Sequence, residues 1–188
     1  MTTCNTDDKS KKINGINLDV LMGTLNAIKE DPELGHCKFR ASNKWVDAAH
    51  NCTTVTEFYA AKQDIDHKQT FELHADEPAI LAGGDEGANP VEHLLHALAG
   101  CVTTSMVAHA AVRGIEIQEL ESELEGDIDL RGFLGLADVP KGFTEIRVKF
   151  KMKANEKDLD EIKSLASFSP VYNTLTNGVK VDIQVELK

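Results

Sequence analysis

The spacing of hydrophobic positions changes several times along the chain, and each change predicts a different secondary structure. Leucine and isoleucine recur at helical intervals over residues 18–28, with Pro32 soon after, which predicts an amphipathic N-terminal helix. Three β-like runs follow, CKFRASNKWV, TTVTEFYAA and QTFELHAD, and predict a meander. They lead into the glycine-rich sequence LAGGDEGA, which we interpret as a flexible approach to a long helix.

Residues 89–114, NPVEHLLHALAGCVTTSMVAHAAVRG, form a nearly unbroken apolar stretch with well-marked ends. Asn89 is a favourable N-cap, Pro90 suits the first helical position, and Gly114 suits the left-handed residue after the last turn. A helix of about 24 residues at 1.5 Å each would be about 36 Å long. Most of its circumference is apolar, so we expect it to be buried in the centre of the fold.

The rest of the chain returns to alternating patterns. The segments IEIQELESELEGDIDLRG and FTEIRVKFKMKA predict two strands. Asn155 can cap a helix that ends near Ser167, the Ser169-Pro170 pair interrupts it, and a short helical turn ends at Asn177. The last segment, VKVDIQVEL, alternates strictly and predicts a closing strand. This mixture of strands and helices predicts an α+β fold.

Composition narrows the class of protein. The 188 residues suffice for one domain, or for a subunit that shares its core with a partner. The net charge of −11 lies in mixed-sign segments, so we expect no nucleic-acid partner and no membrane partner. No run reaches the roughly 18 uninterrupted apolar residues of a membrane span, and the polar start lacks a signal-peptide core, which predicts a cytoplasmic protein. We divide the chain into residues 1–36, a disordered start plus the N-terminal helix, and the main domain, residues 37–188.

The four cysteines, at positions 4, 37, 52 and 101, contain no CxxC pair. Neither a zinc ribbon nor a thioredoxin-type motif is therefore indicated, and we expect free thiols, no metal and no cofactor. Cys101, in the middle of the apolar stretch, has two interpretations: a small hydrophobic residue in a core, or a nucleophile. It lies about three turns from the helix start, too far for the helix dipole to activate it. A reactive Cys101 would need a cation from elsewhere in the fold or from a second subunit.

The run NPVEHLLHALAGCVTTSMVAHAAVRGI, preceded by GGDEGANP and followed by two strands, SPVYNTL and VKVDIQVEL, resembles the OsmC-like family. That family includes osmotically induced protein C and the organic hydroperoxide resistance proteins. The resemblance extends from Cys37 to the C-terminus. It implies an intertwined homodimer in which antiparallel six-stranded sheets wrap long central helices. It also implies that the thiolate of Cys101 attacks the O–O bond of an organic hydroperoxide and becomes a sulfenic acid.

The other family positions match less well. A second cysteine, just before a proline in the later helix, resolves the first in peroxidase members, but Ser169 stands there. A glutamate directly after the NP dipeptide helps to hold the thiolate charged in the family. Here the acid is Glu92, one place later and about 180° around an ideal helix from Cys101. Glu92 can equally be a helix-start charge that complements the dipole.

The family also places an arginine of the N-terminal strands beside the thiolate. Arg40 lies in this region, while His50 and Cys52 stand where a basic residue is expected. His50 can assist a thiolate, although it reads more simply as an exposed loop residue. Cys52 can act as a substitute resolving thiol if its Cα lies within about 7 Å of that of Cys101. Three further histidines, which we interpret as solvated rather than metal-binding, are His93, His96 and His109.

Two functions remain open. The first is a thiol-dependent reductase of organic hydroperoxides, with Cys101 as nucleophile and an external thiol or Cys52 as its reductant. The second is a non-catalytic homodimer that binds a small hydrophobic ligand in its interface cleft. The absent resolving cysteine favours the second, and Cys101 at the family position favours the first. We adopt the enzyme as the working hypothesis.

Overall fold

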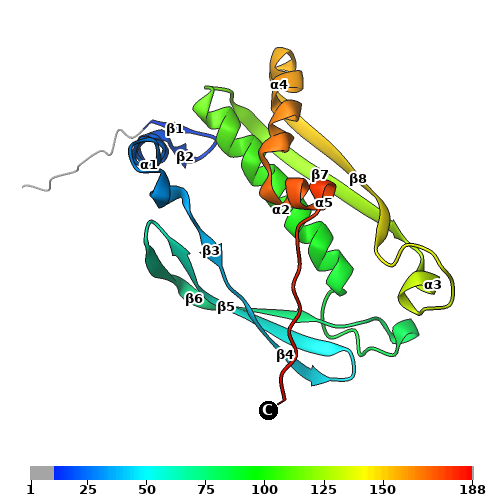
Figure 1. Ribbon diagram of the computed structural model, residues 1–188. Coiled ribbons are helices and arrows are strands. Elements are labelled where there is room, and N and C mark those ends of the chain that lie inside the picture. Colours follow the sequence, from blue (N-terminus) through cyan, green and yellow to red (C-terminus); the bar gives the residue numbers. More distant parts are fainter. Residues whose placement is uncertain (1–10, 188) are drawn as a thin grey trace, which may run out of the picture. The chain divides into compact units, whose positions relative to one another are not determined.

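The computed structural model describes residues 11–187 and divides the chain into two compact units. The first unit ends at Leu94 and the second begins at Leu95, so the boundary lies within one long helix, α2 (Pro90–Val112). Helices and antiparallel strands are mixed along the chain (Figure 1), which confirms the predicted α+β class. Most of the start that we expect to be disordered lies outside the described residues.

The first unit opens with a small hairpin and a helix. The elements are β1 (Lys12–Ile13), β2 (Ile16–Asn17) and α1 (Leu18–Glu30), followed by a 3₁₀ turn (Pro32–Gly35). Asn17 caps α1, because its side-chain oxygen accepts the backbone N–H of Asp19 at 3.0 Å and of Val20 at 3.2 Å. The helix predicted from the leucine spacing is confirmed. The hairpin before it is too short to leave an alternating pattern in the sequence.

An antiparallel sheet completes the first unit. Its strands are β3 (Lys38–Phe39), β4 (Ser42–Asp47), β5 (His50–Ala60) and β6 (Gln63–Ala75), and a 3₁₀ turn follows (Ala79–Leu81). β3 and β4 pair with different parts of β5, while β6 pairs along the length of β5. The meander is therefore confirmed, but its first predicted strand is two strands, separated at Arg40 and Ala41.

The glycine-rich sequence between β6 and α2 forms a loop held around Asp76, a fully buried carboxylate. It accepts three backbone hydrogen bonds, from Glu77 at 2.8 Å, Gly84 at 2.9 Å and Glu86 at 3.2 Å. Burial acts to raise the pKa of Asp76, but these hydrogen bonds outweigh it and keep the pKa below its usual value. We expected a flexible approach to the helix, whereas the structure ties this loop to the end of β6.

The second unit contains the remainder of α2 and a long antiparallel hairpin. The strands β7 (Ile117–Ile128) and β8 (Phe143–Ala154) confirm the two alternating segments, and a short helix between them, α3 (Leu130–Phe133), was not predicted. The helical part that follows consists of a 3₁₀ turn (Glu156–Asp158), α4 (Leu159–Ser164), a second 3₁₀ turn (Leu165–Phe168) and α5 (Pro170–Asn177). Asn155 caps it as predicted, accepting the N–H of Lys157 at 3.2 Å.

The fully buried hydrophobic residues of the described chain all belong to the second unit. One face of α2 supplies half of them: Leu98, Val102, Met106 and Ala110. Ile162 and Leu165 pack against this face, together with partly buried side chains of β7 and β8. By length and composition alone, α2 could also cross a membrane, but the core helix of a globular protein meets the same two criteria.

The C-terminal segment differs from its prediction. Residues 178–187 alternate as a strand should, but the structure assigns them no strand (dark red in Figure 1). Val181 is 74% exposed, Ile183 82% and Val185 90%. The predicted closing strand is wrong for the single chain, because an alternating segment becomes a strand only when a neighbour pairs with its backbone.

The loop geometry predicts the effect of a single methyl group. A Cβ added at Gly87 would lie 2.5 Å from the carbonyl oxygen of His74, whereas a Cβ at Gly142 would meet nothing within 4 Å. Gly87→Ala should lower the free energy of unfolding by about 1–3 kcal/mol, through overpacking against the backbone. Gly142→Ala, the matched control, should change it by less than about 0.5 kcal/mol. Chemical denaturation measures both, and equal stabilities would contradict the close approach.

Candidate functional site

Cys101 lies on α2, beside the buried face of the helix rather than within it. Its neighbour Val102 is buried in the core, whereas Cys101 is half-buried and Gly100 is exposed. A Cβ at Gly100 would meet nothing within 4 Å, so the helix surface next to Cys101 is open. The thiol is free, and within residues 95–187 no hydrogen bond or ion pair reaches it. Cys101 thus lies at the edge of the core of the second unit.

The arginines of the second unit are paired with groups other than Cys101. Arg113 donates to the carbonyl oxygen of His109 at 3.0 Å and forms an ion pair with Glu161 at 3.2 Å. Arg131 pairs with Asp129, and Arg147 pairs with three acids, Glu125, Asp127 and Glu145. The second unit therefore provides no arginine for a thiolate at Cys101.

Arg40, the arginine that the family resemblance singles out, has two acidic partners in the first unit. Arg40 follows β3, and its Nη1 lies 3.1 Å from Oε1 of Glu57 and 2.8 Å from Oδ1 of Asp64. The hydrogen bond that Arg40 donates to Asp64 raises the pKa of the Arg40 guanidinium above its usual value, which keeps the side chain charged. These contacts join β3, β5 and β6 across the break in the first predicted strand.

Glu92 takes part in the start of α2. Its carboxylate accepts the backbone N–H of Asn89 at 2.8 Å, while the side-chain oxygen of Asn89 accepts the N–H of Val91 at 2.9 Å. This reciprocal arrangement is a capping box, which satisfies N–H groups that have no partner within the helix. The structure therefore gives Glu92 a place at the helix start, in agreement with one of the two interpretations of its position.

Ser169 is fully buried and caps α5. Its hydroxyl oxygen accepts the N–H of Tyr172 at 3.2 Å, and its carbonyl oxygen accepts a hydrogen bond from the side chain of Asn173 at 2.8 Å. Pro170 follows at the first helical position, where its missing N–H costs nothing. The sequence identified the interruption at this point, and the structure adds the hydrogen bonds that make serine suitable there.

Cys52 and His50 lie on β5, next to a histidine that sequence reasoning missed. Cys52 pairs directly with His74 of β6, and its sulfur is 4.0 Å from Nε2 of that ring. Nδ1 of His74 is 3.0 Å from Nε2 of His50. His50 is half-buried in a strand, so its interpretation as an exposed loop residue is wrong. Only the register of β5 with β6 reveals His74 as the neighbour.

Two of the three histidines of α2 are also more enclosed than expected. Nε2 of His93 lies 2.9 Å from the carbonyl oxygen of His74. The ring of His109 stacks on that of Phe168, with the ring centres 4.1 Å apart. Burial lowers the pKa of His109, and the charge of Arg113 adds to the effect. No group of three or more potential metal ligands suited to an ion occurs among the described residues.

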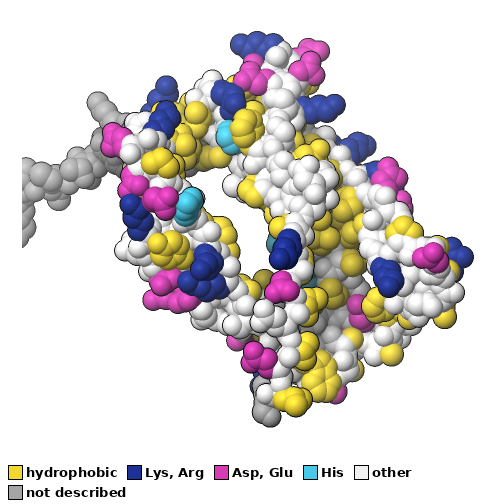
Figure 2. Space-filling view, in the orientation of Figure 1, with side chains coloured by type: hydrophobic (Ala, Val, Ile, Leu, Met, Phe, Trp, Pro, Cys, Tyr) yellow, Lys and Arg dark blue, Asp and Glu magenta, His cyan; other side chains and the backbone are white. Residues whose placement is uncertain are grey.

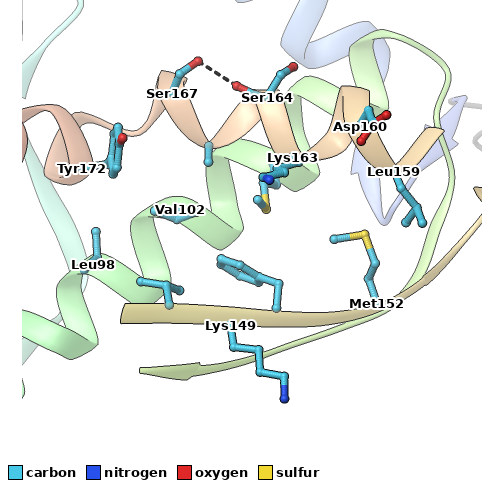
Figure 3. Close-up of a pocket in the computed structure, with 14 residues that line it drawn as sticks. Leu98, Val102, Lys149, Met152, Leu159, Asp160, Lys163, Ser164, Ser167 and Tyr172 are labelled. Carbon is cyan, nitrogen blue, oxygen red and sulfur yellow. Dashed lines mark hydrogen bonds between the residues drawn. The ribbon is translucent and has the colours of Figure 1, made fainter. Parts of the chain in front are cut away.

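A cavity of about 1030 Å³ lies in the second unit. Figure 3 shows Leu98 and Val102 of α2 and Met152 of β8 directed toward it, with α4 and Tyr172 along another side. Charged side chains are few on its wall: Lys149, Asp160 and Lys163. Cys101 is not among the residues that line this cavity, although its helix neighbours Leu98 and Val102 are.

Comparisons with known proteins agree with the sequence resemblance. The family model described as OsmC-like protein matches residues 83–184, just over half of the chain. The matched segment contains Glu92, Cys101 and Ser169, whereas Arg40 and Cys52 lie before it. A comparison with functionally curated proteins found no match.

Solved structures share the fold. An OsmC like protein from Mycoplasma pneumoniae is 20% identical with a TM-score of 0.57, and the alignment covers 75% of this chain and 89% of that one. A Psychrobacter arcticus protein named for osmotic stress induction and a detoxification response is 17% identical with a TM-score of 0.54, covering 71% and 85%. At these identities the likeness concerns the fold alone.

The cap at Ser169 predicts a stability change independent of any chemistry. Ser169→Ala removes the acceptor for the N–H of Tyr172 at a buried helix end, so it should lower the free energy of unfolding by about 1–2 kcal/mol. Ser167→Ala is the matched control, because its exposed hydroxyl only donates to the carbonyl oxygen of Ser164. Denaturant titration compares the two variants. Equal losses would show that the Ser169 hydroxyl has no special structural role.

Proposed function

Because the chain belongs to the OsmC-like protein family, we propose that it is a thiol-dependent reductase of organic hydroperoxides with Cys101 as its nucleophile. The observation that carries the proposal is Cys101 itself. It is a free, half-buried thiol on α2, within the segment that the family model matches. A core cysteine with no chemical role would be better placed on the face of Leu98 and Val102, which is buried.

The reaction requires only the thiolate and the substrate. The sulfur of Cys101 attacks the terminal oxygen of ROOH, the O–O bond breaks, and the alkoxide leaves and takes a proton as the alcohol. Cys101 is left as a sulfenic acid. A first external thiol converts it to a mixed disulfide and water, and a second releases the Cys101 thiol and a small disulfide. A reducing cytoplasm would supply such thiols.

The thiolate of Cys101 needs a positive charge from outside the second unit. Arg113, Arg131 and Arg147 are engaged with acids of that unit. We propose that the first unit, of the same chain or of a second copy, supplies the charge, with Arg40 as the candidate. Arg40 is itself paired with Asp64 and Glu57, so its choice rests on the family position of the arginine and requires a change of partner.

We propose that the working form is a homodimer. The sheet of the first unit leaves large hydrophobic side chains in solvent, among them Phe39 at 77% and Trp45 at 67% exposure. Hydrophobic side chains are visible at the surface in Figure 2. The C-terminal segment carries a further apolar row without a strand partner. A second copy that pairs with this segment would cover both kinds of surface.

A non-catalytic binding role is the second candidate, and the cavity of the second unit favours it. The space of about 1030 Å³ is walled mostly by apolar side chains and could hold a small hydrophobic molecule. Ser169 in place of a resolving cysteine is compatible with this role. Cys101 distinguishes the two candidates, because a ligand held in this cavity does not require a thiol that is not among its lining residues.

Oxidation by an organic hydroperoxide tests the nucleophile. With cumene hydroperoxide, Cys101 should form a trapped sulfenic acid faster than the other three thiols, and excess oxidant should convert it to a sulfinic acid, because Ser169 cannot resolve it. Peptide mass spectrometry measures both, with Cys101→Ser as the control that loses turnover with a dithiol. Equal labelling of all four cysteines would contradict the enzyme and favour the binding role.

Ser169→Cys extends this test to the resolving position. If residues 169 and 101 come together as the family resemblance implies, oxidation of this variant should stop at an intramolecular disulfide, a loss of two hydrogens by intact mass. Turnover with a dithiol should then increase. Overoxidation without a disulfide would show that the two residues do not meet, or that Cys101 is not peroxidatic.

Charge on the C-terminal apolar row tests the dimer. Ile183→Lys should raise the dimer dissociation constant at least about tenfold, because burial of one isoleucine contributes about 1.5–3 kcal/mol. Gln184→Lys adds the same charge on the opposite face of the alternation and should leave the dimer intact. Sedimentation velocity over a concentration series measures both variants. A wild-type monomer at micromolar concentration, or two variants with the same constant, would contradict pairing through this row.

A further inference from the structure

One row of the first sheet places three chemically distinct side chains next to one another. Cys52 of β5 is directly opposite Lys44 of β4 on one side and His74 of β6 on the other. Side chains of directly opposed residues lie on the same face of a sheet, with Cβ atoms about 4.5–5.5 Å apart. The row therefore presents an ammonium group, a thiol and an imidazole in that order.

A second histidine extends the row along β5. His50 precedes Cys52 by two residues and so lies on the same face. Its Nε2 is 3.0 Å from Nδ1 of His74, and Nε2 of His74 is 4.0 Å from the sulfur of Cys52. Because His74 uses opposite ring nitrogens for its two neighbours, the side chains form a chain and do not converge on one point, as metal ligands would.

The backbone around His74 is held from several sides. Nε2 of His93 lies 2.9 Å from the carbonyl oxygen of His74, and the loop at Gly87 approaches the same oxygen too closely for a Cβ. The fixed carboxylate of Asp76 lies close enough to His50 to interact with it electrostatically. These contacts limit the movement of the strand that carries His74, so the order of sulfur, His74 ring and His50 ring is built into the fold.

We propose that Cys52, His74 and His50 form a thiol–imidazole–imidazole relay, and that Cys52 is a second reactive thiol that exchanges with small anionic disulfides. In this arrangement Nδ1–H of His74 donates to Nε2 of His50, which leaves Nε2 of His74 free to accept the thiol proton. His74 is the base and His50 is the positioning residue. Thiol–imidazole distances in unliganded sites often exceed those in the reacting complex, so 4.0 Å is compatible with this role.

The exchange balances without another reagent. Cys52 transfers its proton to His74, and the thiolate attacks one sulfur of RS–SR, so that a Cys52–S–SR bond forms while the original S–S bond breaks. The leaving thiolate takes the proton from His74 and departs as RSH. The site is thus modified by any small disulfide that the surroundings supply, and the reaction does not involve Cys101.

The choice of an anionic disulfide follows from the setting of Cys52. Lys44 and His74 are exposed on either side of Cys52, so the thiol has a polar approach beside an ammonium group, while the acid Asp47 lies further along the row, opposite His50. Glu72 lies two residues before His74 on the same face and is the acid nearest along that strand. A disulfide that carries carboxylates would meet the ammonium group of Lys44 as the reacting sulfur meets Cys52.

The test uses full-length protein in which Cys52 is the only cysteine, after replacement of Cys4, Cys37 and Cys101 by serine. A matched protein retains only Cys37, which is exposed. With 3,3′-dithiodipropionate as the probe, intact mass gives the rate of mixed-disulfide formation. Cys52 should react at least about tenfold faster than Cys37, because the His74 ring lies 4.0 Å from the sulfur of Cys52, whereas His36, the residue before Cys37, pairs with Glu33. Equal rates would overturn the proposal.

Substitutions then assign the roles. His74→Ala should reduce the rate to that of Cys37, and added imidazole should restore part of it, which a purely structural loss would not allow. His50→Gln keeps an acceptor near the position of Nε2 and should retain most of the rate, whereas His50→Leu should not. His36→Asn, an exposed control histidine, should have no effect. An unchanged rate in His74→Ala, or no difference between the two His50 variants, would contradict the relay.

The charge preference is tested with a second probe of opposite sign. Lys44→Gln should slow the reaction with dithiodipropionate several-fold and leave the reaction with cystamine, a cationic disulfide, equal or faster. Since all these proteins lack Cys101, the outcome is independent of the hydroperoxide reductase. Equal slowing with both probes would show that Lys44 supports the strand only, and would contradict the anionic specificity.

Discussion

Burial of one apolar helix is the constraint on which the second unit depends. Leu98, Val102 and Met106 of α2 can leave water only by packing against β7, β8 and the helical segment that follows, and these contacts make up the hydrophobic core. The same packing decides where Cys101 lies. Because Cys101 is next to the buried face, the core holds it in place without enclosing it. An ordered backbone and an accessible thiol are both needed in a nucleophile.

Hydrogen bonding at helix ends explains two positions that differ from the family pattern. Glu92 completes the capping box of α2, and Ser169 caps α5 from a fully buried position. Both satisfy backbone N–H groups that would otherwise lack partners. Each side chain therefore has a structural reason to be present whether or not it takes part in chemistry. The fold can persist while the resolving chemistry at residue 169 is absent.

The two thiols of interest have contrasting surroundings. Cys101 lies on α2 beside the buried face of the helix, and no ion pair reaches it within residues 95–187. Cys52 lies in a polar row, with an imidazole on the adjacent strand. Under the two proposals, Cys101 would react with an organic hydroperoxide and Cys52 with a charged, water-soluble disulfide. One chain thus offers two environments for sulfur chemistry, and sheet register rather than composition creates the second.

Local patterns were enough to predict the longer elements α1, α2 and β5 to β8, because their signals lie within a few residues, but not the β1–β2 hairpin, α3 or the split into β3 and β4. The limits of α2 follow from Asn89, Pro90 and Gly114, and the strands β7 and β8 follow from alternation alone. The family resemblance also singled out Cys101 as the candidate nucleophile, which stays a prediction. Which residues of neighbouring strands lie opposite one another could not be predicted from the sequence. His74 contacts Cys52 only because of the register of β5 with β6, which joins residues 22 positions apart. The segment after Gly178 also depends on pairing. Its alternation determined that it could be a strand, but only hydrogen bonding to a neighbouring backbone, which the tertiary structure supplies or withholds, decides whether it is one.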